Sequence, residues 1–225
     1  MSVSGHLRIS LAEYDSRIRT FVPYYEDLVG IVGESLRLIS SPEPRIVDLG
    51  VGTGALAAAC LDARPEAGLV GIDSDPGMLR AAAVRLAAYP RVELLEGDFL
   101  KADIPACDAI VASISLHHIR KPDEKRTFYA KCRAALRGSG MLVTADCFPG
   151  AEPALAAEHR EAWLIHLEKA YSRPEAEAHL LAWAEEDVYF SLEREMAWLR
   201  EAGFRPEVLW RRDGFAVVAG LAGLA

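Results

Sequence analysis

The sequence has few cysteines and no pattern that pairs them. Its four cysteines form no Cys-x-x-Cys pair, and no cysteine–histidine cluster has zinc-finger spacing: Cys60, Cys107, Cys132 and Cys147. We therefore expect neither a disulfide framework nor a structural metal, and we predict no metal site. Isolated cysteines of this kind are typical of small buried residues in a reducing cytoplasm, which is the location we predict.

Long apolar runs and a surplus of positive charge are also missing. No stretch approaches the ~20 apolar residues that cross a bilayer, and residues 1–10 lack an apolar core behind a basic start. We therefore predict neither a membrane association nor a signal peptide. The net charge of −8 disfavours nucleic acid as a partner, because an acidic surface repels phosphate.

What the sequence does contain is a regular alternation of short apolar runs and helical stretches. The length and the 51% hydrophobic content suit one globular domain. The apolar runs predict strands at residues 45–49, 69–73, 91–96, 109–113 and 141–146. Helices are predicted between them at 55–63, 76–88 and 125–136. This alternation predicts a parallel sheet with helices on both faces.

The two ends of the chain do not show this alternation of strands and helices. A helical stretch over 10–38, broken near Pro23, precedes the first strand. Beyond Phe148 the pattern predicts helices at 153–171, 174–187 and 191–202, then strand-like runs at 207–210 and 214–219. Ser172 and Glu175 have the spacing of a capping box for the second of these helices.

A glycine-rich turn, Asp48-Leu49-Gly50-Val51-Gly52-Thr53-Gly54, follows the first predicted strand and leads into a helix. Glycines let such a turn approach a ligand closely, and related turns hold the pyrophosphate of nicotinamide and flavin cofactors. Asp48 would repel a pyrophosphate, and it suits a ligand that carries an ammonium group. Asp73 ends the next strand, where a carboxylate can accept hydrogen bonds from ribose hydroxyls, as it also does in nicotinamide enzymes.

In this order and spacing, the motifs resemble class I methyltransferases that use S-adenosylmethionine (SAM), over residues 45–146 and again over 191–220. The resemblance implies that SAM is the cofactor and S-adenosylhomocysteine the product. It implies an α/β, Rossmann-like fold: a seven-stranded, mostly parallel sheet with helices on both faces, an antiparallel last strand and a helical cap. The cofactor-binding residues that it implies are Asp48, Gly50, Gly52, Gly54, Asp73, Ser74, Met78, Asp98, Phe99 and Ser113. In the family, Met78 would lie against adenine, Asp98 would bind its amino group, and Phe99 would pack beside it.

The N-terminus has a looser resemblance of its own. Tyr14-Asp15, Ile18-Arg19 and Val22-Pro23-Tyr24-Tyr25 are similar to the caps of carboxy-SAM synthase and its relatives, which serve tRNA wobble-uridine modification. That similarity adds Tyr14, Arg19 and Tyr25 to the expected cofactor contacts. The residues around Arg211 depart from that family, so carboxy-SAM chemistry remains an alternative.

Methyl transfer requires a nucleophile held in line with the methyl group, and a base only if the nucleophile arrives protonated. His117 and His118 follow the fourth strand, where ligands bind in open sheets, and histidine titrates near neutral pH. We predict His117 as the catalytic residue. We predict the acceptor contacts as His118, Tyr24, Trp163 and His166. The alternative is that these histidines and aromatic residues are structural.

The expected organisation is a single methyltransferase domain in four segments. Residues 1–40 form an N-terminal helical cap, 41–148 the SAM-binding core, 149–190 a helical insertion that covers the acceptor, and 191–225 a terminal helix and hairpin. The predicted function is in-line methyl transfer to a small-molecule acceptor. The alternatives are a carboxy-SAM synthase-like or tRNA-modification enzyme and a non-catalytic SAM-binding protein. A homodimer is expected by analogy alone.

Overall fold

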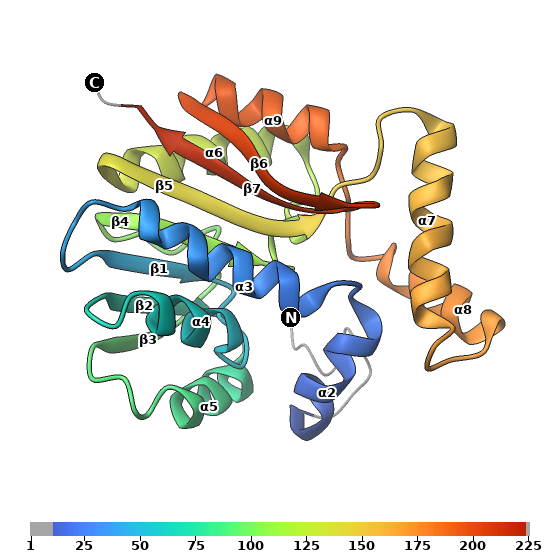
Figure 1. The fold of residues 1–225 in the computed structure, drawn as a ribbon, viewed down its shortest axis with the longest axis horizontal. Helices are drawn as coiled ribbons and strands as arrows, with labels where there is room; N and C mark the ends of the chain where they lie inside the picture. Colours follow the sequence, from blue (N-terminus) through green and yellow to red (C-terminus); the bar gives the residue numbers. More distant parts are fainter. Residues whose placement is uncertain (1–10, 224–225) are drawn as a thin grey trace.

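A computed structural model describes residues 11–223 of the chain. Residues 1–10, for which no signal peptide is predicted, lie outside the described residues, as do 224–225. The described residues form one seven-stranded sheet flanked by helices (Figure 1). Its strands are β1 (Arg45–Leu49), β2 (Gly68–Asp73), β3 (Val92–Glu96), β4 (Cys107–Ser113), β5 (Leu136–Cys147), β6 (Phe204–Arg212) and β7 (Phe215–Ala222).

The strand order is β3-β2-β1-β4-β5-β7-β6, which confirms the predicted topology. Pairing is parallel from β3 through β2, β1 and β4 to β5. β7 is the reversed strand, because it pairs antiparallel with both β5 and β6. Strands of a parallel sheet are covered on both faces and are apolar throughout, and β1 and β4 are accordingly buried over nearly their whole length.

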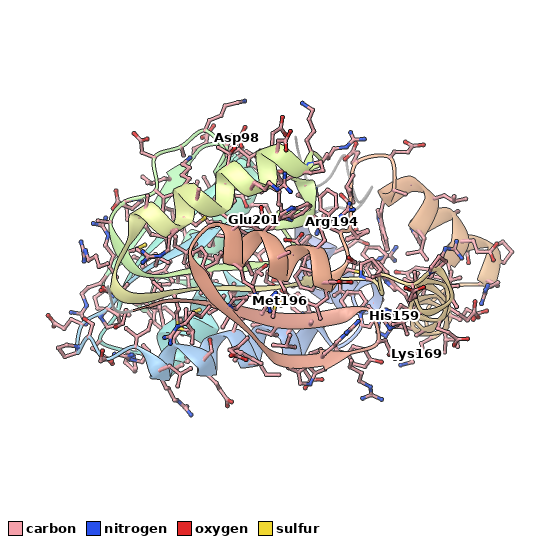
Figure 2. The ribbon with its side chains drawn as sticks, turned by 90° about the horizontal axis from the view of Figure 1, so that it is seen from above. Asp98, His159, Lys169, Arg194, Met196 and Glu201 are labelled. Carbon is pink, nitrogen blue, oxygen red and sulfur yellow. The ribbon has the colours of Figure 1, made fainter. Side chains whose placement is uncertain are left out.

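Helices cover both faces of the sheet and bury two apolar clusters against it. One face carries α3 (Tyr25–Ser35), α4 (Ala55–Ala63) and α5 (Pro76–Arg85), and the other carries α6 (Pro122–Ala135) and α9 (Leu192–Glu201) (Figure 1). Figure 2 shows α9 from above, with Arg194 and Glu201 toward its two ends. The Glu201 carboxylate lies 3.1 Å from Arg126, which ties α9 to α6.

Three helices stand beyond one end of the sheet rather than over its faces. They are α2 (Leu11–Phe21), α7 (Pro153–Leu167) and α8 (Arg173–Trp183) (Figure 1). Trp163 Nε1 donates a 2.7 Å hydrogen bond to the carbonyl oxygen of Phe21, so α7 packs against α2. The predicted capping box of Ser172 and Glu175 is present at the start of α8.

The structure departs from the sequence prediction mainly at the ends of elements. β5 begins at Leu136 and includes the predicted turn over 138–140, because Leu136 pairs with Cys107 before the register shifts. Gly138 accommodates this irregularity with a φ of 42°. The helices α5, α7 and α8 end before the predicted residues. No helix within residues 11–223 is long and apolar enough to span a membrane.

Candidate active site

A cavity of about 370 Å³ lies at the carboxyl ends of the parallel strands, between the sheet and the three helices at its end. Gly50 follows β1, Asp73 ends β2, Ser113 ends β4 and Asp146 lies near the end of β5, and all four line the cavity. Open α/β sheets bind ligands at this edge, because the turns that follow the strands diverge there. The volume lies in the range of small-molecule sites.

The glycine turn lines one side of this cavity. Gly50 and Gly52 have φ of 77° and 55°, in the left-handed region that favours glycine. A Cβ on Gly50 would lie 2.8 Å from the Cβ of Ser115, whereas a Cβ on Gly52 would meet no atom closer than 3.9 Å. Gly52 therefore has open space at its Cβ position and lines the cavity, so the backbone there can approach a ligand.

The Asp48 carboxylate lies beneath this turn, fully buried, and neither oxygen has a hydrogen-bond partner among the described residues. Burial, together with the nearby charge of Asp73, raises its pKa to about 8. A nearby cation would stabilise the ionised form of a buried carboxylate that has no hydrogen-bond partner. Its position therefore fits the positively charged ammonium group of SAM, although Asp48 itself does not line the cavity.

Asp73 lies at the other edge of the turn and is held by the backbone. Its two carboxylate oxygens accept hydrogen bonds from the amides of Gly52 (2.8 Å) and Asp75 (2.9 Å). Burial raises its pKa more than these two bonds lower it. Ser74 and Met78 also line the cavity, and Met78 is fully buried at the start of α5. This edge therefore offers an oriented carboxylate for two hydroxyls beside an apolar surface.

Asp98 and Phe99 complete this half of the cavity from the loop after β3. Asp98 is partly exposed and lies 3.0 Å from Lys101, and Phe99 packs at 5.6 Å from the ring of Phe128. Figure 2 shows Asp98 near the edge of the molecule. A planar base could lie along the Phe99 ring with its amino group toward the Asp98 carboxylate, as the sequence resemblance implies.

His117 lies on the short 3₁₀ helix η2 (Leu116–His118) that follows β4, and it is only 4% exposed. Its Nδ1 lies 2.8 Å from Asp146 Oδ1, and its backbone amide donates to the other oxygen of Asp146 at 3.3 Å. Burial lowers the pKa of His117, but the charge and hydrogen bond of Asp146, with the charge of Asp187, outweigh it and raise the pKa. Asp146 therefore orients the imidazole and leaves Nε2 on the side of Asp187, which also lines the cavity.

The turn that carries His117 is fixed by further contacts. Ile114, immediately after β4, has a φ of 50°, which is rare for a β-branched residue. Its amide donates to the carbonyl of Ala145, and Lys125 Nζ donates to the carbonyl of Leu116 at 2.8 Å. Lys125 is itself buried and lies 3.0 Å from Glu195. Strain of this kind persists only where the surroundings hold it, so this network positions His117.

The other half of the cavity is aromatic. Its rings come from α2, from the insertion and from the start of β7: Phe21, Trp163, Trp183, Tyr189 and Phe215. Trp163 makes edge-to-face contacts with Tyr189 at 5.7 Å and with Phe215 at 5.0 Å. His117 lies at one side of this aromatic half, with its ring 5.1 Å from that of Tyr189.

Most of the predicted site residues come together in the cavity. Those that line it are Tyr14, Gly50, Gly52, Asp73, Ser74, Met78, Asp98, Phe99, Ser113, His117, His118 and Trp163. Asp48 and Gly54, at the two ends of the glycine turn, do not line the cavity. The remaining four, Arg19, Tyr24, Tyr25 and His166, do not line the cavity.

Their contacts explain why those four lie elsewhere. The exposed Arg19 side chain pairs with Glu26 and lies over the ring of Tyr25, which is partly buried against the core. The Tyr24 hydroxyl donates to Asp213 at 2.6 Å, at the turn between β6 and β7. His166 Nε2 lies 3.1 Å from the carbonyl oxygen of Arg19, so it joins α7 to α2.

Sequence reasoning missed Asp146, Asp187, Tyr189 and Phe215 as site residues. Asp146 ends the fifth predicted strand, so its place at the cavity edge could have been inferred in the same way as that of Asp73. Asp187 and Tyr189 follow α8, and no spacing in the sequence links them to His117. Their position depends on how the insertion folds back onto the core.

The sheet order, the single reversed strand and the cavity residues are those expected of a class I SAM-dependent methyltransferase, as the sequence motifs imply. Comparison with known proteins agrees. A family model described as a methyltransferase domain matches residues 46–140. Carboxy-S-adenosyl-L-methionine synthase of Campylobacter hominis is 28% identical over 91% of this chain and 88% of its own length.

Two further relatives are O-methyltransferases. Malonyl-[acyl-carrier protein] O-methyltransferase of Halalkalibacterium halodurans is 33% identical over 63% of this chain and 53% of its own length. The structure of an O-methyltransferase family 2 protein from Planctomyces limnophilus, in complex with apigenin, matches with a TM-score of 0.70 and 18% identity, over 99% of this chain and 62% of that protein. Sequence and fold together support a class I SAM-dependent methyltransferase with SAM as its cofactor.

Proposed function

We propose that this methyltransferase modifies a small aromatic acceptor that occupies the half of the cavity beneath the insertion. The observation that carries the proposal is the composition of this half, where five aromatic rings line the cavity beside one buried, oriented histidine. Aromatic walls favour a flat ligand through stacked and edge-to-face contacts, and one polar group among them orients it. In this proposal His118 and Trp163 contact the acceptor, whereas Tyr24 and His166 support the cap from outside the cavity.

SAM, when bound, supplies a methyl group on a reactive sulfonium. The chain's own residues position the cofactor and the acceptor and exclude water from the site. Asp73 would hold the ribose hydroxyls, Asp98 and Phe99 the adenine, and the field of Asp48 the ammonium end. The aromatic half excludes water and places the acceptor nucleophile beside His117 Nε2, which accepts its proton.

Turnover with a panel of hydroxylated aromatic compounds tests the acceptor class. We expect S-adenosylhomocysteine to form with at least one of phenol, catechol and apigenin, the last because a structural neighbour binds it. Calorimetry with SAM alone serves as the control, since it reports on cofactor binding without an acceptor. A protein that binds SAM and turns over no member of the panel would refute the aromatic acceptor.

The role of His117 is tested by its replacement. We expect His117→Ala to lower kcat by about 100-fold or more, the usual contribution of a general base, with little change in SAM affinity. His159→Ala is the matched control, because His159 lies on α7 and does not line the cavity. Full turnover by His117→Ala at saturating acceptor would remove His117 from the mechanism.

The contacts of His117 determine in which direction activity changes with pH. His117 accepts a proton only when it is neutral, and its pKa is raised above the ordinary value of 6.5. Activity should therefore rise with pH and reach its plateau above the range of an ordinary histidine. Asp146→Asn removes the charge that stabilises the imidazolium, so it should move this acid limb to lower pH while it lowers the maximal rate.

A second candidate is a carboxy-SAM synthase-like or tRNA-modification enzyme, and the similarity to carboxy-SAM synthase over nearly the whole chain favours it. An additional cofactor carboxylate would need a cationic partner. Among the described residues that line the cavity, Arg120 is the only arginine, and Arg19 lies outside the cavity. Native mass spectrometry of the purified protein distinguishes the two, because bound carboxy-SAM and bound SAM differ in mass. A non-catalytic SAM-binding protein is disfavoured by the cavity beside His117.

We further propose that the enzyme works in the cytoplasm as a single domain, with 149–190 as the acceptor-covering insertion. The four cysteines are buried and unpaired, which suits a reducing compartment. The net charge of −8 supports a small-molecule partner over nucleic acid. A homodimer is proposed by analogy, and light scattering during gel filtration tests it.

A further inference from the structure

Carboxylates and imidazoles alternate from the interior of the cavity toward solvent. Asp146 Oδ1 lies 2.8 Å from His117 Nδ1, and His117 Nε2 lies 3.7 Å from Asp187 Oδ1. The same Asp187 oxygen lies 3.0 Å from His118 Nδ1. Burial changes along this row: the side chains of His117 and Asp187 are 5% and 3% exposed, whereas that of His118 is 43% exposed.

Because His117 is buried, the proton that it accepts needs a route to solvent, and the methyl-transfer step itself provides none. Each turnover with a protonated acceptor leaves a proton on His117, which must be lost before the next turnover. His117 is enclosed by the aromatic half of the cavity, by Asp146 and by the insertion, so bulk water has little access to it. A proton stored there needs a path of polar groups to solvent.

We propose that Asp187 and His118 form this path, a proton relay from the buried His117 to solvent. The inference rests on the proposed function, in which His117 is the base. The acceptor X–H bond breaks, X bonds to the methyl carbon, and the proton goes to His117 Nε2. It then passes to Asp187 Oδ1 and on to His118 Nδ1, and His118 releases a proton to water from Nε2. The proton count balances without another reactant.

The distances suit this order of transfer. Asp187 Oδ1 and His118 Nδ1 are within hydrogen-bond reach, and a shift of about 0.5 Å brings Asp187 within the same reach of His117 Nε2. The insertion holds Asp187 in place, because the amide of Val188 donates to the carbonyl oxygen of His117 at 3.1 Å. The carboxylate and the imidazole it serves are thus fixed by one backbone contact.

The charged groups around His117 favour transient storage of the proton. Asp146 faces it from β5 and Asp187 from the insertion, and both stabilise an imidazolium. Lys125 faces it from α6 and opposes this, but Glu195 lies 3.0 Å from Lys125 and offsets its charge. The neighbouring His118 ring, at 4.3 Å, is the exit group itself.

The same side chains are also a candidate metal set, since one ligand atom from each of His117, His118 and Asp187 lies within 4.8 Å of the others. Ligands on opposite sides of a zinc ion are about 4.2 Å apart at most, with bonds of about 2.1 Å. A span up to 4.8 Å would have to contract for all three ligand atoms to reach one ion, whereas the relay needs a single shift of about 0.5 Å. Metal binding is therefore an outcome of the test.

The kinetic test replaces His118 by asparagine, because its side-chain amide can still form a hydrogen bond with Asp187 but cannot carry a proton. With the member of the aromatic panel turned over fastest, we expect His118→Asn to lower kcat about tenfold, less than loss of the base itself. The first turnover, followed by rapid quench, should stay fast. Added imidazole buffer should restore part of the steady-state rate. His159→Asn is the control and should match the unmodified enzyme.

Two results would overturn the relay in this assay. One is a His118→Asn enzyme with the original kcat and no dependence on buffer concentration. The other is loss of activity on treatment with a chelator and its recovery with zinc, which would assign the cluster to a metal. If the unmodified enzyme turns over no member of the panel, the proposed acceptor class fails, and the relay is then judged by a measurement that needs no acceptor.

That measurement is a histidine ¹⁵N NMR titration of the protein with S-adenosylhomocysteine bound. We expect Asp187→Asn to lower the pKa of His117 by about one unit, because it removes a carboxylate a few ångströms away. His118 should shift in the same direction, and His159 should not move. Unchanged titration of both His117 and His118 in Asp187→Asn would overturn the coupling on which the relay depends.

Discussion

The unpaired carboxylate beneath the glycine turn makes a quantitative prediction about stability. Asp48 is fully buried, and its pKa is raised from 3.8 to about 8 by burial and by the charge of Asp73. Between these two values the folded protein binds a proton that the unfolded chain has lost. Stability without cofactor must therefore fall as pH rises from about 4 to about 8, and the loss is complete above pH 8.

The size of the effect follows from the same numbers. From the ordinary pKa of 3.8 to pH 7 is about three units, which corresponds to about 4 kcal/mol at 1.36 kcal/mol per unit. Asp48→Asn removes this penalty but leaves a buried amide that costs about 1–3 kcal/mol. We expect the variant to have a free energy of unfolding about 1–3 kcal/mol higher than the original at pH 7.

Urea unfolding at several pH values, without cofactor, measures this directly. The stability difference between Asp48→Asn and the original protein should grow by about 1.4 kcal/mol per pH unit between pH 5 and 7, whatever the amide costs. A difference that stays constant across this window would show that Asp48 is ionised in the folded protein, and the reasoning would fail.

The cofactor should reverse the balance. The ammonium group of SAM favours ionised Asp48, so binding at pH 7 should release a proton, which calorimetry in two buffers of different ionisation enthalpy detects. 5′-Methylthioadenosine lacks the ammonium group and should release none. Asp48→Asn should weaken SAM binding by roughly tenfold, or about 1.4 kcal/mol. Equal affinity and equal proton release in the variant would separate Asp48 from cofactor binding.

Two further predictions concern the framework of the site. Gly50→Ala would place a Cβ 2.8 Å from that of Ser115 at a φ of 77°, and we expect a loss of about 1–3 kcal/mol with loss of SAM binding; Gly30→Ala, in open space on α3, should cost nothing by thermal denaturation. Lys125→Met leaves the buried Glu195 without its cationic partner and should cost about 3–5 kcal/mol. Adding Glu195→Gln should recover part of that loss, and a double variant no more stable than the single one would contradict the pairing.

The order of strands and helices was predictable because it depends on local patterns. Apolar runs of strand length mark β1 and β2, and the glycine turn with Asp48 and Asp73 marks the cofactor edge of the sheet. Ends of elements were less certain, as at β5, because the pairing of Leu136 with Cys107 depends on a strand distant in sequence. Sequence resemblance at the N-terminus pointed to Arg19 and Tyr25, yet neither lines the cavity: Arg19 pairs with Glu26 at the surface, and Tyr25 packs beneath it.

The sequence by itself therefore determined the fold class and the cofactor, because the contacts with SAM come from short segments at the ends of successive strands. Only the tertiary structure decided what surrounds His117. Asp146 approaches it from β5 and Asp187 from the end of the insertion, and the aromatic walls come from three separate parts of the chain. No periodicity or spacing records such neighbours, because they are brought together by the packing of the insertion and α2 against the end of the sheet.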